Sequence, residues 1–551
     1  MRVAARPRVR CSFRAGHSGR PLPGHRPRAP RRSRPDRTDR EPRLLPALWR
    51  EPARRRPRRA RRVPHPFRAH ASSAEPSLSL LPRFGTLTRR HRRGDHSGQG
   101  PRKGAALPIP RRYGRPVRVE LAYGRGALAV ELPEEACSEL RILEKTEGAP
   151  LPDPARALRS ALEAPIGTRP LRELARGRRD AVIVVSDRTR PVPNALLLPP
   201  ILDALREGGL PAERVTVQVA TGLHRPCTAA ELEEMLGAPL AGSLRIVQHD
   251  ARDLESHVDL GSRSGLPVLI DRFFLERDLR IATGLIEPHL MAGYSGGRKA
   301  VCPGLAAVET IRVAHGASML EGHVGPGIVA GNPLHEALLE VVRKIGVDFL
   351  VNVALDRRRR VAGVFCGDLE AAHAEGMRFV EAESHVALDR PADLVIVSAG
   401  GHPLDTTFYQ AIKGVAAAAG VVRSGGIILL AASLSEGIGS PSFEKCLRES
   451  EGPAAFELCL RDDRFFAIDQ WMVQHLCQAL RRARVFLYSD GLDRATQREL
   501  FVEPVASPEE GVARALTLLG PKPRTVVIPQ GPYILATIRG EKRPIGGPAG
   551  P

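Results

Sequence analysis

The residues that carry the most chemistry in this sequence of 551 residues lie close together, between positions 284 and 315. This stretch holds His289, the glycine-rich turn GYSGG and then Lys299. Glycines allow a backbone to approach a ligand closely and to present N–H groups to an anion. A lysine just past such a turn can pair with a phosphate or act as a covalent nucleophile. Any one of these residues alone is more often part of a surface turn, but the combination favours a ligand site.

Two further motifs, SDRTRP and TGLHR, follow strand-like runs. The planar fork of Arg190 suits a carboxylate or a phosphate, although a structural pair with Asp187 that braces the proline-rich turn is the alternative. His224 can act as a general base, since the unperturbed pKa of histidine lies near physiological pH. The alternative for His224 is a structural hydrogen bond to a loop carbonyl.

The two histidines at 289 and 315 have different expected chemistry. His289, in the tripeptide EPH, is either an acid/base residue or a structural one, and Glu287 stands close enough in sequence to orient it. His315 follows a predicted turn and helix, where a neutral imidazole can bind a soft divalent metal. No HExxH motif and no His/Cys cluster accompanies it. A metal at His315 would therefore need its remaining ligands from a cofactor.

A further group lies on FYQAIKG, which contains Tyr409, Gln410 and Lys413. Residues i and i+4 share a helical face there, and Lys413 can hold a substrate carboxylate, although exposed helix lysines are common. No GxGxxG fingerprint follows a strand and no Walker-type loop is present, so neither nucleotide-binding motif is available. Three other histidines in loop-like sequence are interpreted as solvated: His249, His257 and His323.

The elements that must position these residues alternate short β-branched runs with amphipathic helical stretches, the pattern of a mainly parallel α/β sheet. Strands are predicted at 181–185, 214–220, 279–283 and 349–355, and in a second series at 393–401, 425–433, 484–490 and 524–531. Each polar motif begins where a strand ends. Because ligands of open α/β sheets bind at the carboxyl ends of the strands, the motifs predict one shared active site in a cleft between two α/β domains.

The chain divides into a disordered basic arm, an N-terminal α/β catalytic domain, a C-terminal α/β domain with substrate-binding residues, and a disordered tail, predicted at 1–116, 117–388, 389–540 and 541–551. The arm holds 33 Lys or Arg against 6 Asp or Glu, whereas residues 117–551 hold 50 against 55. It is rich in Arg and Pro with few apolar runs, so it cannot bury enough surface to fold. We interpret it as the product of a start assigned upstream of the real one. A nucleic-acid arm and a transit peptide are the alternatives.

Composition disfavours several classes of protein. No run reaches the roughly 20 apolar residues of a membrane span. The 8 cysteines are scattered without a CxxC pair, which argues against zinc ribbons, iron–sulfur clusters and a secreted disulfide framework. We therefore expect a cytoplasmic protein.

Taken together, VSDRTRP, TGLHR, EPHLMAGYSGGRKAVCPG and FYQAIKG resemble the nickel-pincer lactate racemase family. The specific part is GYSGGRK with the spacing of His289, Lys299 and His315, and the resemblance spans residues 117–535 but not the arm. It implies a racemase or epimerase of a 2-hydroxy acid that works by reversible hydride transfer. Cofactor-biosynthesis proteins would be its partners, and a 2-hydroxy acid its small-molecule substrate; no membrane is expected, and a nucleic acid is disfavoured as a partner.

The resemblance also implies roles for single residues. Lys299 would be joined through a thioamide to a pyridinium mononucleotide that binds nickel, and His315 would complete the nickel coordination. The cofactor would further contact three residues near these: Asp187, Gly296 and Gly297. His224 and His289 would be the two acid/base residues. The substrate would be held by Arg190, Tyr409, Gln410, Lys413 and Trp471.

Two alternatives stay open. An NAD-dependent hydroxy-acid dehydrogenase would share the carboxylate clamp and a histidine, but the glycine fingerprint is missing. A nucleic-acid-binding protein would lose its salt-sensitive affinity on deletion of residues 1–116, whereas an enzyme built on the remaining residues would keep its activity.

Overall fold

The computed structural model describes residues 117–133, 139–146, 150–321, 323–462 and 465–540. The predicted basic arm at 1–116 and the predicted tail at 541–551 lie outside these residues. Within the described ranges, no helix is long and apolar enough to cross a membrane.

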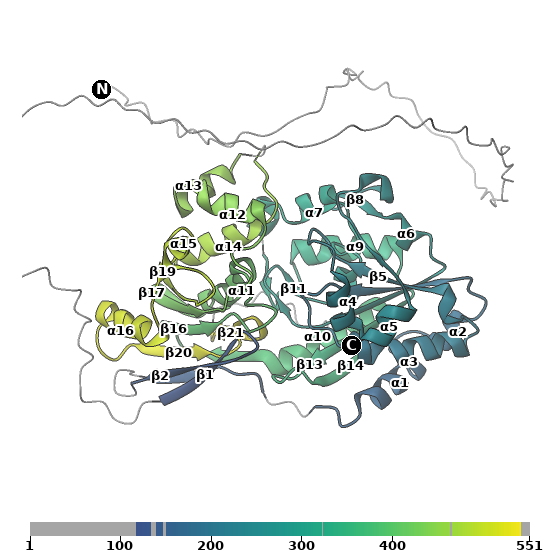
Figure 1. Cartoon of the computed structure of the whole chain (residues 1–551), viewed down its shortest axis with the longest axis horizontal. Helices are drawn as coiled ribbons and strands as arrows, with labels where there is room; N and C mark the ends of the chain where they lie inside the picture. Colours follow the sequence, from purple (N-terminus) through teal and green to yellow (C-terminus); the bar gives the residue numbers. More distant parts are fainter. Residues whose placement is uncertain (1–116, 134–138, 147–149, 322, 463–464, 541–551) are drawn as a thin grey trace, which may run out of the picture. The chain divides into compact units, whose positions relative to one another are not determined.

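Two six-stranded sheets form the frame of the α/β fold, as predicted (Figure 1). The first has the order β14-β13-β9-β4-β5-β6, and within it only the edge strand β14 runs antiparallel to its neighbour. Its strands are β4 (Ala181–Ser186), β5 (Val215–Ala220), β6 (Arg245–Gln248), β9 (Leu279–Leu285), β13 (Phe349–Leu355) and β14 (Val361–Gly367). The central strands are nearly continuous apolar runs, since helices cover both faces of the sheet.

Successive residues of β4 point to opposite faces of this sheet. Ile183 and Val185 pack into one hydrophobic cluster with α1 (Pro154–Glu163), α2 (Leu171–Ala175) and α3 (Asn194–Glu207). Val182 and Val184 pack into another, which includes side chains of five further helices: α6 (Arg272–Leu275), α7 (Val308–Ala314), α8 (Ala317–Leu320), α9 (Pro333–Ile345) and α10 (Leu369–Ser384). This second cluster continues to the other sheet, so the two sheets share a core.

The second sheet has the order β19-β18-β17-β16-β20-β3 and is parallel throughout. Its strands are β3 (Glu139–Ile142), β16 (Ala392–Ser398), β17 (Val422–Ala431), β18 (Ala483–Tyr488), β19 (Glu503–Pro504) and β20 (Arg524–Ile528). One face packs against α16 (Pro508–Leu519) and the hairpin of β1 (Val117–Tyr123) and β2 (Gly126–Leu132). On the other face lie α11 (Phe408–Ala419) and α14 (Gln470–Leu480).

The predicted division, which places residues 117–142 with the N-terminal domain, stays a prediction. Strand β3 pairs with β20, and the β1–β2 hairpin packs against the second sheet. The boundary at 388/389 stays a prediction. It falls between β15 (His385–Leu388), which pairs with β21 (Leu535–Ile538), and the first strand of the second sheet after it.

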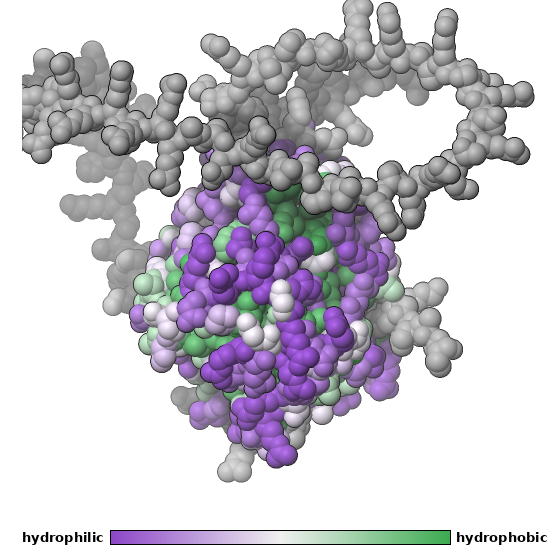
Figure 2. Space-filling model, turned by 90° about the vertical axis from the view of Figure 1, so that its right-hand side faces the viewer, coloured by the Kyte–Doolittle hydropathy of each residue, from purple (hydrophilic) through white to green (hydrophobic). Residues whose placement is uncertain are grey.

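The remaining elements are short. A hairpin joins β7 (His257–Arg263) to β8 (Leu266–Asp271), and a three-stranded sheet joins β10 (Pro288–His289), β11 (Ala292–Tyr294) and β12 (Gly325–Pro326). The other helices are α4 (Ala229–Leu236), α5 (Ala238–Ser243), α12 (Pro441–Arg448), α13 (Pro453–Cys459) and α15 (Arg494–Arg498). Short 3-10 turns lie at η2 (Ala212–Arg214), η3 (Leu254–Ser256), η4 (Gly297–Ala300) and η5 (Gly531–Tyr533). The face on the side of the first sheet is mostly hydrophilic, with hydrophobic patches between the polar side chains (Figure 2).

Candidate active site

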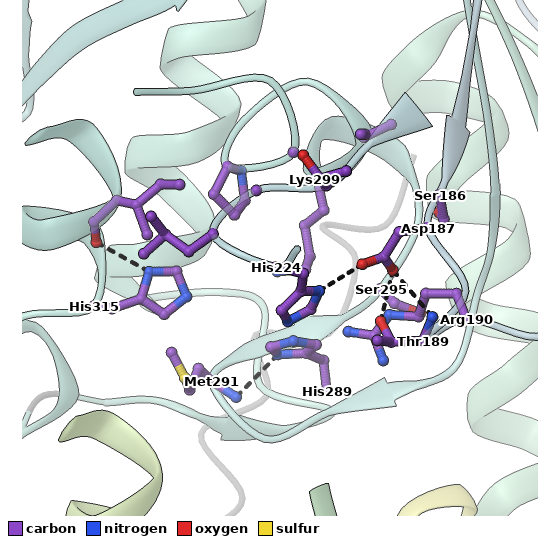
Figure 3. Close-up of a pocket in the computed structure, with 18 of the residues that line it drawn as sticks. Ser186, Asp187, Thr189, Arg190, His224, His289, Met291, Ser295, Lys299 and His315 are labelled. Carbon is purple, nitrogen blue, oxygen red and sulfur yellow. Dashed lines mark hydrogen bonds and ion pairs between the residues drawn. The ribbon is translucent and has the colours of Figure 1, made fainter. Parts of the chain in front are cut away.

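One cavity of about 170 Å³ lies where the carboxyl ends of β4, β5 and β9 face α11 and α14 of the second sheet. It is the shared site that the position of the motifs predicts, and residues of both sheets line it. The lining includes every predicted site residue except one: Asp187, Arg190, His224, His289, Gly296, Lys299, His315, Tyr409, Gln410, Lys413 and Trp471. Figure 3 shows His224, His289, Lys299 and His315 around this space.

His224 and Asp187 form an ion pair beyond the carboxyl ends of β5 and β4. Nδ1 of His224 lies 2.6 Å from Oδ2 of Asp187, so Nδ1 carries the proton and Nε2 is left for another partner. Burial alone would lower the pKa of His224, but the charge and the hydrogen bond of Asp187 outweigh it and raise that pKa above its ordinary value. The pKa of Asp187 is lowered, since its bonds to His224 and Thr189 outweigh its burial.

His289 is held by the backbone and not, as the sequence suggests, by Glu287. Its Nδ1 accepts hydrogen bonds from the N–H groups of Met291 and Ala292, both at 3.2 Å. The neutral ring therefore carries its proton on Nε2. Burial, followed by the charges of Lys299 and other cations, holds the pKa of His289 well below its usual range. Glu287 pairs instead with Arg190, at 3.2 Å.

Lys299 lies on η4, directly after the glycine-rich turn. Burial, followed by the charge of Arg190, holds the pKa of its amine well below the usual range, which favours the neutral, nucleophilic form. Gly296 lines the cavity at φ +73°, but Gly297 does not line it. The N–H of Gly297 donates to Oδ1 of Asn352 at 2.8 Å, so it is not offered to an anion. The structure thus gives no support to Gly297 as a direct cofactor contact.

His315 ends α7 with its ring against the cavity. Nδ1 donates to the carbonyl of Ile311 at 3.1 Å, which leaves Nε2 as the nitrogen able to bind a metal. Burial, followed by the charge of Lys299, lowers the pKa of His315 to about 3, so the imidazole is neutral as metal binding requires. Among the residues that the structure describes, no group of three or more His, Cys, Asp or Glu could hold a metal.

Other residues of the lining form the candidate substrate clamp. Arg190 and Lys413 both line the cavity, and burial, followed by the charge of Arg190, lowers the pKa of Lys413 to about 7. Oε1 of Gln410 is buried without a hydrogen-bond partner in the described ranges. Nε1 of Trp471 donates to Oη of Tyr409 at 3.0 Å, which connects α14 to α11. These groups suit a small molecule with a carboxylate and a hydroxyl.

One lining residue that the motifs do not indicate is Asp469, which precedes α14 at φ +69°. Its Oδ2 accepts from Oγ of Ser440 at 2.5 Å. Burial raises the pKa of this carboxyl above its usual range. The only sequence signal is an acid before a helix, which indicates an N-cap and not a cavity residue.

The interpretation of His249 and His257 as solvated is wrong. They are 2% and 5% exposed, and their rings meet edge to face at 5.0 Å. Nδ1 of His249 lies 3.0 Å from Oδ2 of Asp271. This second His–Asp pair lies outside the cavity and holds β8 to the strand-end loops.

The fold and the cavity define an α/β enzyme whose site lies between two mainly parallel sheets. Residues 123–325 match the family model of the lactate racemase N-terminal domain, and residues 388–536 match that of the lactate racemase C-terminal domain. The lactate racemase of Thermoanaerobacterium thermosaccharolyticum is 33% identical over 424 residues, which are 76% of this chain and 98% of the relative. That of Lactiplantibacillus plantarum is 33% identical over 420 residues, 75% of this chain and 98% of the relative.

Solved structures give the same result. The lactate racemase apoprotein from Thermoanaerobacterium thermosaccharolyticum matches with a TM-score of 0.71 and 32% identity over 76% of this chain and 100% of that one. A Thermotoga maritima protein shares the fold, with a TM-score of 0.56 and 19% identity over 72% of this chain and 100% of that one. The chain belongs to the lactate racemase family and is an isomerase.

Proposed function

We propose that this protein interconverts the two enantiomers of lactate or a closely related 2-hydroxy acid, with a nickel-pincer cofactor attached to Lys299. The observation that carries the proposal is that His224, His289, Lys299 and His315 line a single cavity. The names of the two curated relatives support lactate as the substrate. Proteins that make the cofactor would be required partners.

The residues present fit such a group. Lys299 offers an amine whose lowered pKa favours the neutral form that the covalent link needs, and Nε2 of His315 offers one nitrogen ligand to nickel. Since the described residues supply no protein-built metal cluster, the other nickel ligands would come from the cofactor. When bound, the cofactor would accept a hydride from the second carbon of the substrate and return it.

The two histidines start from complementary states. Nε2 of His224 is free to take the proton of the substrate hydroxyl, and Asp187 stabilises the imidazolium that results. Nε2 of His289 carries the only proton of a neutral ring, so His289 would first take up a second proton and then, as the imidazolium, give one to the substrate oxygen on the other face. In the reverse direction His289 would take the hydroxyl proton, and the imidazolium of His224 would return one. Two bases are therefore sufficient for racemisation.

Arg190 and Lys413 would hold the carboxylate of the substrate while the configuration at its second carbon is inverted. A fork from Arg190 and a point charge from Lys413 bind a carboxylate from two sides. The acceptor Oε1 of Gln410 suits a hydroxyl of the substrate. Tyr409 and Trp471 would close the pocket over it.

The test is to produce the protein together with the cofactor-synthesis machinery, then measure intact mass, nickel content and the enantiomer ratio by chiral chromatography. The parent is expected to carry a mass adduct and nickel and to racemise lactate. Lys299→Ala should lose the adduct and the activity. Lys145→Ala is a matched control, because Lys145 is also partly buried with a lowered pKa but bonds the carbonyl of Leu355 outside the cavity. An adduct that persists in Lys299→Ala would refute the attachment site.

A further inference from the structure

Glu287 lies outside the main cavity but pairs with a residue inside it. Its Oε1 is 3.2 Å from Nη1 of Arg190, and Glu287 is 7% exposed. The second carboxylate oxygen, Oε2, is buried and has no hydrogen-bond partner among the residues described. Keeping a half-satisfied carboxylate buried is costly, so Arg190 is the main group that holds it in place.

Arg190 has two carboxylates within reach. Asp187 belongs to the same turn, since the backbone N–H of Arg190 donates to its carbonyl at 3.1 Å, and the charge of Arg190 helps to lower the pKa of Asp187. The oxygens of Asp187 are already bonded to His224 and Thr189. Without a carboxylate on its other side, Arg190 would be drawn toward Asp187 and would compete with His224 for it.

The cavities around Glu287 show that its side chain does not line the main cavity itself. Two small cavities of about 20 Å³ each adjoin Glu287, and one of them shares Arg190, His289 and Lys413 with the main cavity. Glu287 lines both small cavities but not the large one. It therefore reaches the substrate space through Arg190 and does not touch the reacting atoms.

We propose that Glu287 is the positioning residue of the carboxylate clamp: its ion pair keeps the guanidinium of Arg190 turned to the cavity and away from Asp187. Glu287 then pairs with Arg190, and Asp187 stays bonded to His224. The inference rests on the proposed function, in which Arg190 holds the substrate carboxylate.

The kinetic test replaces Glu287 in the nickel-loaded enzyme. Glu287→Gln keeps the shape and removes the charge, and the KM for lactate should rise roughly tenfold or more while nickel content stays unchanged. Glu287→Asp keeps the charge and should give a KM between those of the parent and the Gln variant. Glu436→Gln is the matched control, because Glu436 pairs at 3.1 Å with Arg188 of the same turn outside the cavity. Its KM should not change.

A KM that stays constant in Glu287→Gln would overturn the inference. A KM that falls would also overturn it, since Glu287 would then be a competitor of the substrate for Arg190. A drop in kcat alone, with KM unchanged, would likewise show that Glu287 does not position the clamp.

A second measurement is independent of catalysis. The charged groups that face His224 are Asp187, Asp469 and Arg190. If Arg190 moves toward Asp187 in Glu287→Gln, the pKa of His224, followed by imidazole NMR in the apoprotein, should fall by roughly one unit. An unchanged pKa in the folded variant would overturn the inference. If the parent does not racemise lactate but the shift occurs, the proposed function fails and the ion-pair inference stands.

Discussion

The indole of Trp471 packs against the imidazole of His315, with ring centroids 4.7 Å apart and planes inclined by 48°. Trp471 lies on α14 beside the second sheet, whereas His315 ends α7 beside the first. Because Nε1 of Trp471 also donates to Tyr409, the contact joins the candidate nickel ligand to the helix that carries Lys413. The candidate metal ligand and the candidate substrate clamp are thus connected through the packing of Trp471.

Replacing this indole should weaken metal retention. Trp471→Ala removes the ring that orients His315, and residues that orient metal ligands change metal affinity by roughly 10- to 100-fold. We expect nickel content after dialysis against a chelator to fall accordingly. Trp471→Phe is the control, because a ring remains against His315 while the bond to Tyr409 is lost. Equal nickel retention in the Ala variant and the parent would contradict this role.

Removing the charge of Asp187 should move the pH profile of catalysis. Asp187 raises the pKa of His224, and a base works only when unprotonated, so Asp187→Asn should shift the acid limb of kcat/KM to lower pH. The loss of the oriented base should also lower kcat/KM by roughly 10²- to 10⁴-fold.

The second His–Asp pair provides the control for that experiment. Asp271→Asn removes the carboxylate from His249, which lies outside the cavity. It should lower the melting temperature and leave the pH profile in place. A profile that moves equally in both variants would show that Asp187 acts only through stability.

The strand-end motifs were predictable for a physical reason. Asp187 directly follows β4 and His224 follows β5, and the carboxyl ends of parallel strands meet at one edge of a sheet. The capping box of Thr228 and Glu231 is a similar local signal, and both of its hydrogen bonds are present. Spacing along the chain determines these features, so the sequence is enough to find them.

Other features depend on partners far along the chain. Glu287 stands two residues from His289, which suggests that it orients the histidine, yet its partner is Arg190, on a different strand-end loop. Strand β3 joins the second sheet only by pairing with β20, which lies almost 400 residues further along the chain. Asp469 enters the cavity through a left-handed backbone conformation. Local pattern contains no information on such long-range pairings.

Lys413 should make substrate binding dependent on pH. Its pKa of about 7 results from burial and then from the charge of Arg190, opposed by Glu287 and Asp187. The charged amine that would hold a carboxylate is therefore present below pH 7 and lost above it. We expect the KM for lactate to rise by about tenfold per pH unit on the alkaline side.

Lys413→Arg tests this assignment, because arginine stays charged throughout the range. The alkaline rise in KM should disappear in this variant, even if its KM at neutral pH differs from that of the parent. Lys344→Arg, at a surface lysine that bonds the carbonyl of Leu260, should keep the rise. A rise that survives in Lys413→Arg would assign it to another group.

The turn before Lys299 should tolerate no side chain at Gly297. This residue has φ +55°, and an added Cβ would lie 2.6 Å from the ring of His373, which is itself held by the carbonyl of Ser295 at 2.8 Å. Gly297→Ala combines backbone strain with a clash in a packed interior, for an expected loss of about 2–4 kcal/mol. Gly437→Ala is the matched control: φ is +86° and nothing lies within 4 Å of its Cβ, so only the strain of about 1–2 kcal/mol applies.

The melting temperature of Gly297→Ala, measured by thermal unfolding, should therefore be lower than that of Gly437→Ala. Because Lys299 follows two residues later, the mass adduct should fall in the first variant alone. Equal melting temperatures in the two variants would mean that His373 moves aside to accept the added methyl group. The packed turn would then not determine the position of Lys299.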